Sequence, residues 1–453
     1  MFKIAGLVVL AAACGPVVGF EDPPASATIT LSSTRIEEQA AAGTAVGRFS
    51  ASDSRIDRFE LIDDADRAFA IAGDTLQVAN GARLNFEAAP SVSITVRATG
   101  PGGAESIEDL TISITDVREV TTLDDSGSGS LRQALSDAAP GERILFETLL
   151  SGKLAVASPL RFTKAVTLSA PGSISIEGTI MGSLIEVGVD ADVTLANLVI
   201  DNRGGGAIIN DGKLAVVHSQ IFNSATTAIA NRGRLAVTDS TFQFNRQAIA
   251  ADGIETVVTG STFANNTTNG SGGAIVGGPI QILNCTFSNN IAGGSGSGGA
   301  IALVAGTSTI AFSTFADNQA NGGGGGVFVA GDARATIRGS VFAHNAATGT
   351  PDVDSSGNPG ALSGIDNILT NGAGTNFASG INNNLIGVDV VLNQLFDNGG
   401  PTATQLPAGG SVSIDHVPVT RCFDLGDHAL IVDQRGLPRP RGGGCDAGST
   451  EVP

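Results

Sequence analysis

The sequence has no Trp and no Tyr, so its aromatic side chains are 20 Phe residues. Cations are also few: 25 Lys and Arg stand against 44 Asp and Glu, which leaves a formal net charge of -19. An acidic chain without Tyr or Trp to stack on bases is not expected to bind nucleic acid. The same absence argues, less strongly, against enzymes that hold sugar rings on Trp or Tyr platforms.

Charged residues make up only 15% of the chain, and helix formers such as Glu, Lys and Met are scarce. Gly, Ser, Thr, Val and Ile dominate instead, which is typical of a β protein. The hydrophobic fraction of 42% allows a buried core and excludes global disorder. The length of 453 residues predicts two or three domains. The 61 Gly residues follow no collagen period and need a local explanation.

The apolar run at the N-terminus is too short to span a bilayer. It covers residues 4–13 after a single cation, Lys3, which indicates an export signal. The small residues before Cys14 resemble a bacterial lipoprotein signal, although Ala11 stands where that motif prefers Leu. The resemblance implies that Cys14 is lipidated, that residues 1–24 are signal and tether, and that the protein is anchored at an outer membrane or cell surface. The alternative is cleavage at an A-x-A site, which gives a soluble secreted protein.

The four cysteines divide by context. Cys14 is the lipidation candidate. Cys422 and Cys445 lie among Gly, Pro and Arg near the C-terminus, where a covalent bond would stabilise a loop-rich end. We expect these two to form a disulfide, because an exported protein matures where disulfides persist. Cys285 is left over.

Residues 25–118 are expected to form a first domain. Short apolar alternations recur between turn residues, which predicts about seven strands and a Greek-key β-sandwich. Several strings in it resemble bacterial cadherin-like domains. They are Ile36-Glu37-Glu38-Gln39 with Gly43-Thr44, Leu84-Asn85-Phe86-Glu87, Val96-Arg97-Ala98-Thr99 and Thr115-Asp116-Val117.

The cadherin-like resemblance implies a calcium site, because such domains bind the ion through clustered carboxylates. Glu38, Glu87 and Asp116 stand where the family keeps its ligands. Asn85 replaces a customary Asp, and Arg118 places a cation beside the cluster. The alternative is a spacer sandwich with a degenerate site, and the chain is expected to require no other cofactor.

Residues 119–180 form the entry to a second domain. The string from Asp124 to Leu135 resembles the opening of many bacterial β-helix surface proteins. Ser130 is a candidate N-cap for a short helix running to about Ala138, which would cover the hydrophobic end of a solenoid. A catalytic role for Ser130 would need a partnered base, and none is near it in the sequence.

Residues 181–345 repeat with spacings of 21, 21, 21, 24, 28 and 27. A period of this size with short β-branched strands and no helical segment predicts a right-handed parallel β-helix. Each turn then stacks like residues on like. The large apolar column is Ile200, Ile221, Phe242, Phe263, Phe287, Phe315 and Phe342, and an Asn column follows it at Asn245, Asn266, Asn290, Asn318 and Asn345. We expect the Phe column inside and the Asn column as an amide ladder at a bend.

The register of the repeat also predicts the surroundings of three residues that could otherwise be taken as functional. Cys285 replaces Ser in an inward column, so we expect a packed thiol. His218 aligns with Asn197 and Asp239 at a bend, and His344 precedes the Asn column, so we expect both to be turn residues. The longer turns coincide with glycine-rich insertions, such as residues 293–299, which we expect to project as stacked loops outside the columns.

Residues 346–453 form the exit from the solenoid. Three strings in it resemble the C-terminal region of bacterial choice-of-anchor Q proteins, a family of exported β-helix proteins with varied anchors. The strings are Asn384 to Gly387, Asp397 to Thr402, and Asp433 to Pro440 followed by Asp446-Ala447-Gly448. The chain departs from the family at Ser449-Thr450, where an aliphatic-aromatic pair is usual.

Two functional classes remain open. The first is a non-enzymatic, surface-anchored protein, expected to be monomeric, that binds extracellular polysaccharide or a cell-surface protein. The second is a polysaccharide lyase or hydrolase of the pectin-lyase fold, which needs a base beside bound calcium or a pair of carboxylates. The best lyase candidates are Asp201, Asn202, Arg203, Asn231, Arg232 and Arg246, and the best carboxylates, Asp239, Asp252 and Glu255, do not share a column. We assign no catalytic residue.

Overall fold

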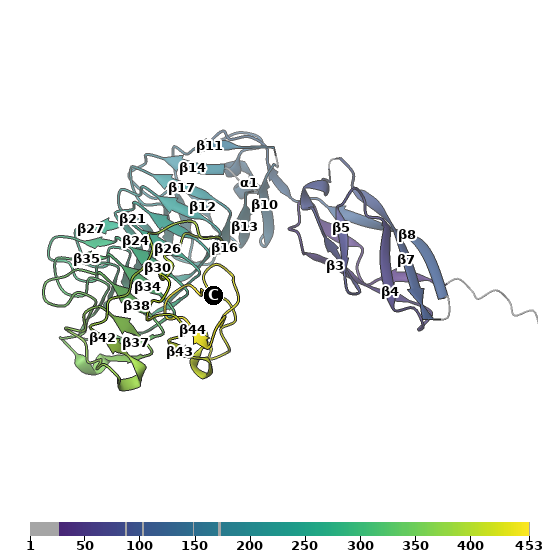
Figure 1. Ribbon diagram of the computed structural model, residues 1–453. Coiled ribbons are helices and arrows are strands. Elements are labelled where there is room, and N and C mark those ends of the chain that lie inside the picture. Colours follow the sequence, from purple (N-terminus) through teal and green to yellow (C-terminus); the bar gives the residue numbers. More distant parts are fainter. Residues whose placement is uncertain (1–26, 87, 102–103, 148, 171–173, 453) are drawn as a thin grey trace, which may run out of the picture. The chain divides into compact units, whose positions relative to one another are not determined.

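The computed structural model describes residues 27–86, 88–101, 104–147, 149–170 and 174–452. Cys14 and Glu87 lie outside these residues. The described chain is almost entirely β structure, and it divides into two compact units, Met1–Val117 and Arg118–Pro453 (Figure 1).

The first unit is a sandwich of two four-stranded sheets around one hydrophobic core. The chain crosses repeatedly from one sheet to the other, as a Greek-key sandwich requires. One sheet has the order β1 (Ile29–Leu31), β3 (Ala45–Ala51), β6 (Thr75–Val78) and β5 (Phe69–Ala72). The other has the order β2 (Arg35–Glu37), β8 (Ala104–Thr115), β7 (Ser91–Gly100) and β4 (Arg58–Asp63).

The second unit is a right-handed parallel β-helix of about ten turns, as predicted. Three parallel sheets run along it. Sheet 1 contains β9 (Arg118–Val120), β10 (Glu142–Phe146), β13 (Val166–Ser169), β16 (Asp192–Ala196), β19 (Lys213–Val217), β22 (Arg234–Thr238), β25 (Glu255–Thr259), β29 (Ile280–Leu283), β33 (Thr307–Ala311), β37 (Arg334–Arg338) and β40 (Leu362–Ile365).

Sheets 2 and 3 complete each turn. Sheet 2 contains β11 (Gly152–Ala155), β14 (Ile174–Gly178), β17 (Val199–Asn202), β20 (Gln220–Phe222), β23 (Thr241–Gln243), β26 (Thr262–Ala264), β30 (Thr286–Ser288), β34 (Thr314–Ala316), β38 (Val341–Ala343), β41 (Ile368–Leu369) and β42 (Leu385–Ile386). Sheet 3 contains β12 (Leu160–Phe162), β15 (Ile185–Val187), β18 (Ile208–Asn210), β21 (Thr227–Asn231), β24 (Gln247–Ala251), β28 (Ile275–Gly277), β32 (Ile301–Leu303), β36 (Val327–Val329) and β39 (Val353–Asp354). Two small sheets pair β27 (Thr267–Thr268), β31 (Ile291–Ala292) and β35 (Gln319–Ala320), and β43 (Val417–Pro418) with β44 (Gly444–Cys445).

The helix expected at the entry is α1 (Leu131–Asp137). The Ser130 hydroxyl caps it by accepting a hydrogen bond from the Gln133 N–H, and Leu131 and Leu135 face inward. Arg132 points the other way and pairs with Asp125 at 2.6 Å. The entry motif is therefore a structural cap. Among the described residues, short 3-10 segments also occur at Gly81–Arg83, Pro359–Ala361, Ile381–Asn383 and Val419–Arg421.

Stacked columns hold the solenoid together. The Phe rings from Phe242 to Phe342 lie parallel with centroids 4.7–4.9 Å apart. In the Asn column, each side-chain amide donates to the amide oxygen of the next turn at 2.9–3.0 Å. Cys285 is fully buried in its Ser column, and burial raises the pKa of its thiol to about 12. The predicted packed thiol is thus observed.

The glycine-rich insertions take part in the backbone hydrogen bonds between successive turns, which was not predicted from the sequence. Gly298 has φ +72°, and its N–H donates to the Gly323 carbonyl. A Cβ on Gly299 would lie 2.2 Å from the Gly325 oxygen, so only glycine fits there. The expectation that residues 293–299 lie wholly outside the columns is therefore wrong for Gly298 and Gly299, which are stacked turn to turn.

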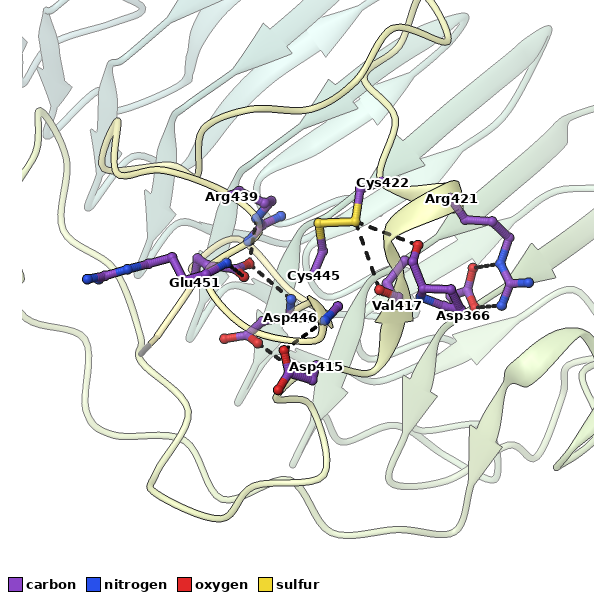
Figure 2. Close-up of a disulfide and its surroundings, with 12 residues drawn as sticks. Asp366, Asp415, Val417, Arg421, Cys422, Arg439, Cys445, Asp446 and Glu451 are labelled. Atoms are coloured by element: carbon purple, nitrogen blue, oxygen red, sulfur yellow. Dashed lines mark hydrogen bonds and ion pairs between the residues drawn. A yellow bond between two sulfur atoms is a disulfide. The ribbon is translucent and has the colours of Figure 1, made fainter.

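The last residues, 397–452, run back along the solenoid and are called the strap here. The predicted disulfide between Cys422 and Cys445 joins two parts of the strap, beside the β43–β44 pair (Figure 2). Near the disulfide, Arg421 of the strap donates to both carboxylate oxygens of Asp366, which belongs to a turn of the solenoid.

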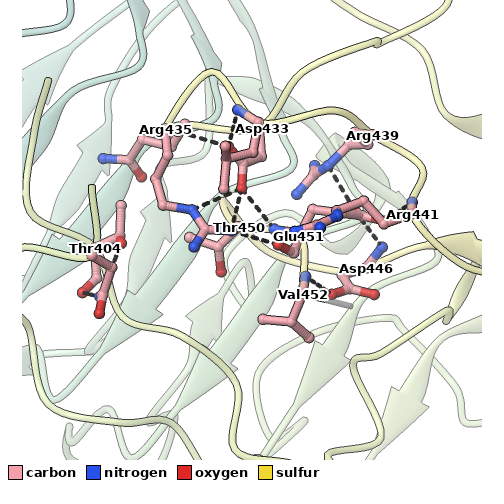
Figure 3. A network of polar contacts seen from close by, with 12 residues as sticks. Thr404, Asp433, Arg435, Arg439, Arg441, Asp446, Thr450, Glu451 and Val452 are labelled. Carbon is pink, nitrogen blue, oxygen red and sulfur yellow. Dashed lines mark hydrogen bonds and ion pairs between the residues drawn. The ribbon is translucent and has the colours of Figure 1, made fainter. Parts of the chain in front are cut away.

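Residues 433–452 of the strap form a buried polar network (Figure 3). Arg439 and Glu451 form an ion pair at 3.0 Å with both side chains fully buried. Burial lowers the pKa of Arg439, and the Glu451 carboxylate opposes that shift. Asp433 accepts hydrogen bonds from the Arg435 guanidinium and from the Glu451 N–H. These charged motif residues are therefore structural.

Candidate functional site

The strap covers one half of the outer face of sheet 2. Outward Thr side chains on β26, β30 and β34 are at most 2% exposed because the strap lies on them. Thr262 donates to the Ala403 carbonyl, Thr286 to the Gln434 side chain, and Thr314 accepts from the Ser449 N–H. This half of the sheet is sealed by hydrogen bonds from the chain itself.

The other half of this face, on β17, β20 and β23, carries outward side chains that the strap leaves accessible; we call it the open face. Gln220 is exposed, and Thr241, Phe222 and Gln243 are partly exposed. These residues alternate with the buried column of the solenoid, so the pleat of the strands points them outward. The open face therefore presents amide, hydroxyl and aromatic groups at the spacing of successive turns.

A groove of about 470 Å³ borders the open face on the side of the strap. Its solenoid wall is the bend between sheets 1 and 2, where His218, Asp239, Gly260 and Asn284 occupy four successive turns. Three steps of ~4.8 Å make this wall roughly 14 Å long. Its other wall is residues 429–436 of the strap. The groove is thus as long as several units of an extended polymer.

His218 and Asp239 are turn residues, as expected, with φ of 47° and 50°. Their side chains form a pair at 3.3 Å between Nε2 and Oδ2. Burial raises the pKa of Asp239, and His218 opposes that shift. A Cβ on Gly260 would lie 2.1 Å from the Asp239 carboxylate, so the glycine makes room for this side chain.

Asp424 brings a second carboxylate to the groove from the strap. Hydrogen bonds from the backbone N–H groups of His428 and Gly426 lower its pKa. No sequence pattern places Asp424 in the same groove as Asp239, because the two residues are 185 positions apart. Only the path of the strap brings the two residues to one groove.

The opposite border of the open face is a corner between sheets 2 and 3. Asp201 is nearly buried, pairs with Arg203 at 3.2 Å and accepts a hydrogen bond from the Asn223 amide. Arg246 lies two turns further along the same corner and is exposed. Asn202 is buried and donates to backbone carbonyls, so it is a structural residue.

The lyase candidates from the sequence do not form one cluster. Arg203 and Arg246 precede sheet 3, whereas Arg232 follows it and pairs with Asp211 at 3.2 Å. Asn231 is buried and bonds to the Thr256 hydroxyl. Asp252 and Glu255 are exposed away from Asp239, and Glu255 pairs with Arg234. The structure therefore joins Asp201 to Arg203 and Asp239 to His218, and leaves the rest apart.

The calcium candidates of the first unit are described in part. Glu38 is buried and accepts hydrogen bonds from the N–H groups of Phe86 and Val117, each at 3.0 Å. Asp116 is exposed, and Glu87 lies outside the described residues. Glu38 thus ties three segments of the sandwich together, and calcium binding stays a prediction. Over the described ranges, no three His, Cys, Asp or Glu side chains are grouped to hold a metal ion.

The class of the second unit is a parallel β-helix whose own C-terminal strap seals part of one sheet. No protein-family model and no curated protein matches the chain. Among solved structures, tailspike protein 3 of bacteriophage CBA120 is 15% identical, with a TM-score of 0.31, over 82% of this chain and 77% of that one. The family 28 exopolygalacturonase of Yersinia enterocolitica is 11% identical, with a TM-score of 0.24, over 78% of this chain and 99% of that one. At these scores the two likenesses carry no argument about function.

Proposed function

We propose that the protein is an exported, surface-anchored β-helix protein that binds an extracellular polymer on the open face without cleaving it. The observation that supports this function is the division of sheet 2 into a sealed half and an open half. The open half lies between a groove and a polar corner, and its outward positions recur at each turn with different polar and aromatic side chains. A rigid, repeating surface of this kind suits a chain-like ligand.

Polysaccharide is the preferred ligand and a cell-surface protein is the second. The open face offers hydroxyl and amide groups from Thr241, Gln220 and Gln243, which match the hydroxyl groups of sugars. The protein is proposed to act as a monomer and without a required cofactor.

An array of immobilised glycans tests the proposal. We expect the full chain to bind at least one polysaccharide and to release neither reducing ends nor unsaturated products from it, with or without calcium. Binding with cleavage would replace the proposal by the enzymatic alternative, and binding to no glycan would leave only the cell-surface protein as partner.

A glycan hydrolase is the second candidate, and one observation favours it. Asp239 and Asp424 line the same groove, and the pKa of the first is raised while that of the second is lowered. Opposite shifts of two carboxylates are the pattern of an acid and its partner in glycoside hydrolysis. Asp239→Asn and Asp424→Asn would each abolish hydrolysis in this case, whereas Asp252→Asn would not.

The proposed membrane anchor is a lipid attached to Cys14. Among the described residues, no helix is long and apolar enough to cross a membrane. We expect labelled fatty acid to enter the wild type, and Cys14→Ser to remove both the label and membrane retention. Release of intact, unlabelled wild type into the medium would contradict lipidation.

A further inference from the structure

A strained aromatic residue stands at the corner that borders the open face. The bend that follows sheet 2 repeats a left-handed residue in successive turns. Its members are Asn223, Phe244, Asn265, Asn289, Asp317 and His344. Asn, Asp and His are the residues that tolerate this conformation, whereas a bulky Phe with φ of 57° is strained. Strain of this kind persists where another interaction requires the residue.

No structural role accounts for Phe244. Phe312 is strained in the same way, but it is fully buried in a hydrophobic cluster with the Arg439 guanidinium 4.9 Å from its ring. Phe244 is instead 57% exposed and belongs to none of the hydrophobic clusters of the described chain. Its ring therefore carries two costs, strain and exposure, and is not part of a buried hydrophobic cluster of the described chain.

The neighbours of Phe244 supply polar groups for a ligand. Arg246 is exposed two residues further on, and no ion pair to its guanidinium occurs within the described ranges. Gln243 points outward from β23, and the Asn223 amide lies one turn back. An aromatic ring, an exposed guanidinium and the Gln243 amide thus share one corner beside the open face, next to the Asn223 amide that bonds to Asp201.

We infer that Phe244 is the platform on which a pyranose ring of the bound polysaccharide stacks, with Arg246 donating to the oxygens of that sugar. The inference rests on the proposed polymer binding and names its contact residues and ligand class. The C–H groups on one face of a sugar ring are slightly positive, and the face of an aromatic ring is slightly negative, so the two attract. The guanidinium then selects hydroxyl or carboxylate oxygens at the ring edge.

The test uses Phe244→Asn, which restores the residue type of the column. We expect this variant to melt at the same or a higher temperature than the wild type, because strain is relieved, and to bind the array glycan at least tenfold more weakly. Phe396→Asn is the matched control, since Phe396 is also exposed, at 69%, but immediately precedes the strap and is not part of the open face. It should bind as the wild type does.

Arg246→Gln tests the second contact against Arg334→Gln, an exposed arginine on sheet 1. We measure the binding of the two variants to a neutral glucan and to a uronic-acid polymer. Weaker binding of either polymer by Arg246→Gln, but not by Arg334→Gln, supports the contact. Unchanged binding of both polymers by Arg246→Gln contradicts it. If the wild type binds a glycan and Phe244→Asn binds it equally well, the platform is wrong while the proposed function stands. If the wild type binds only protein, both the platform and the glycan preference fall.

Discussion

At the scale of single residues, Asp352 ends the Asn ladder and is buried there. One carboxylate oxygen accepts from the Asn345 amide at 2.9 Å, and the other from the Asn371 N–H at 2.6 Å. These two donors favour the charged form, but burial outweighs them and raises the pKa of Asp352 to about 6. The Asn ladder therefore ends on a carboxyl group, Asp352, whose protonated form is favoured by folding.

This preference predicts a dependence of stability on pH. Between the unfolded pKa of 3.8 and the folded value of about 6, the folded state binds more protons than the unfolded state. The contribution of Asp352 is thus most favourable below pH 3.8 and is lost as the pH rises through about 6, by at most about 3 kcal/mol. Asp352→Asn should remove this part of the slope in urea unfolding measured across that window. An unchanged slope would show that Asp352 does not titrate there.

At the scale of elements, the stacked turns depend on which residue stands in which column. Phe287→Ala removes a fully buried ring between two others and should lower the free energy of unfolding by about 3–5 kcal/mol.

The stacked glycine positions, such as Gly299, differ from the Phe column because no side chain fits there. Gly299→Ala tests whether this position tolerates a side chain. The added methyl would meet the Gly325 oxygen and the Gln319 nitrogen, so we expect a loss of about 2–3 kcal/mol in urea unfolding. Gly331→Ala is the matched control, because nothing lies within 4 Å of the added atom and its φ is not positive. It should be neutral or slightly stabilising. Equal stability of the two variants would mean that the column is not tightly stacked.

At the level of the β-helix unit, the strap covers one half of the outer face of sheet 2 and thereby sets the limit of the open face. The disulfide spans 23 residues of the strap, and its loss should cost roughly 3 kcal/mol in the chain-entropy model. We expect Cys422→Ser with Cys445→Ser to raise hydrogen exchange in the strap and on β26 and β30, while β13 and β16 stay protected. Uniformly faster exchange would show that strap and solenoid unfold as one unit.

The solenoid, its Phe and Asn columns, the capping helix and the disulfide could all be predicted from the sequence. This is possible because a repeat forces equivalent residues to stack, and because cap and column residues lie near one another along the chain. The packed Cys285 and the turn positions of His218 and His344 follow from the same register.

Which part of the surface stays open could not be predicted from the sequence, because it depends on the three-dimensional path of the strap. The strap joins residues that are far apart in the sequence, such as Asn284 and Val432, whose amide and carbonyl meet at 3.0 Å. No periodicity predicts where a non-repeating segment returns to the solenoid. The presence of Asp239 and Asp424 in one groove, the sealing of the Thr column and the burial of Arg439 with Glu451 all depend on that return. The strain at Phe244 is likewise visible only in the backbone, because a Phe in a polar column has no signature in composition.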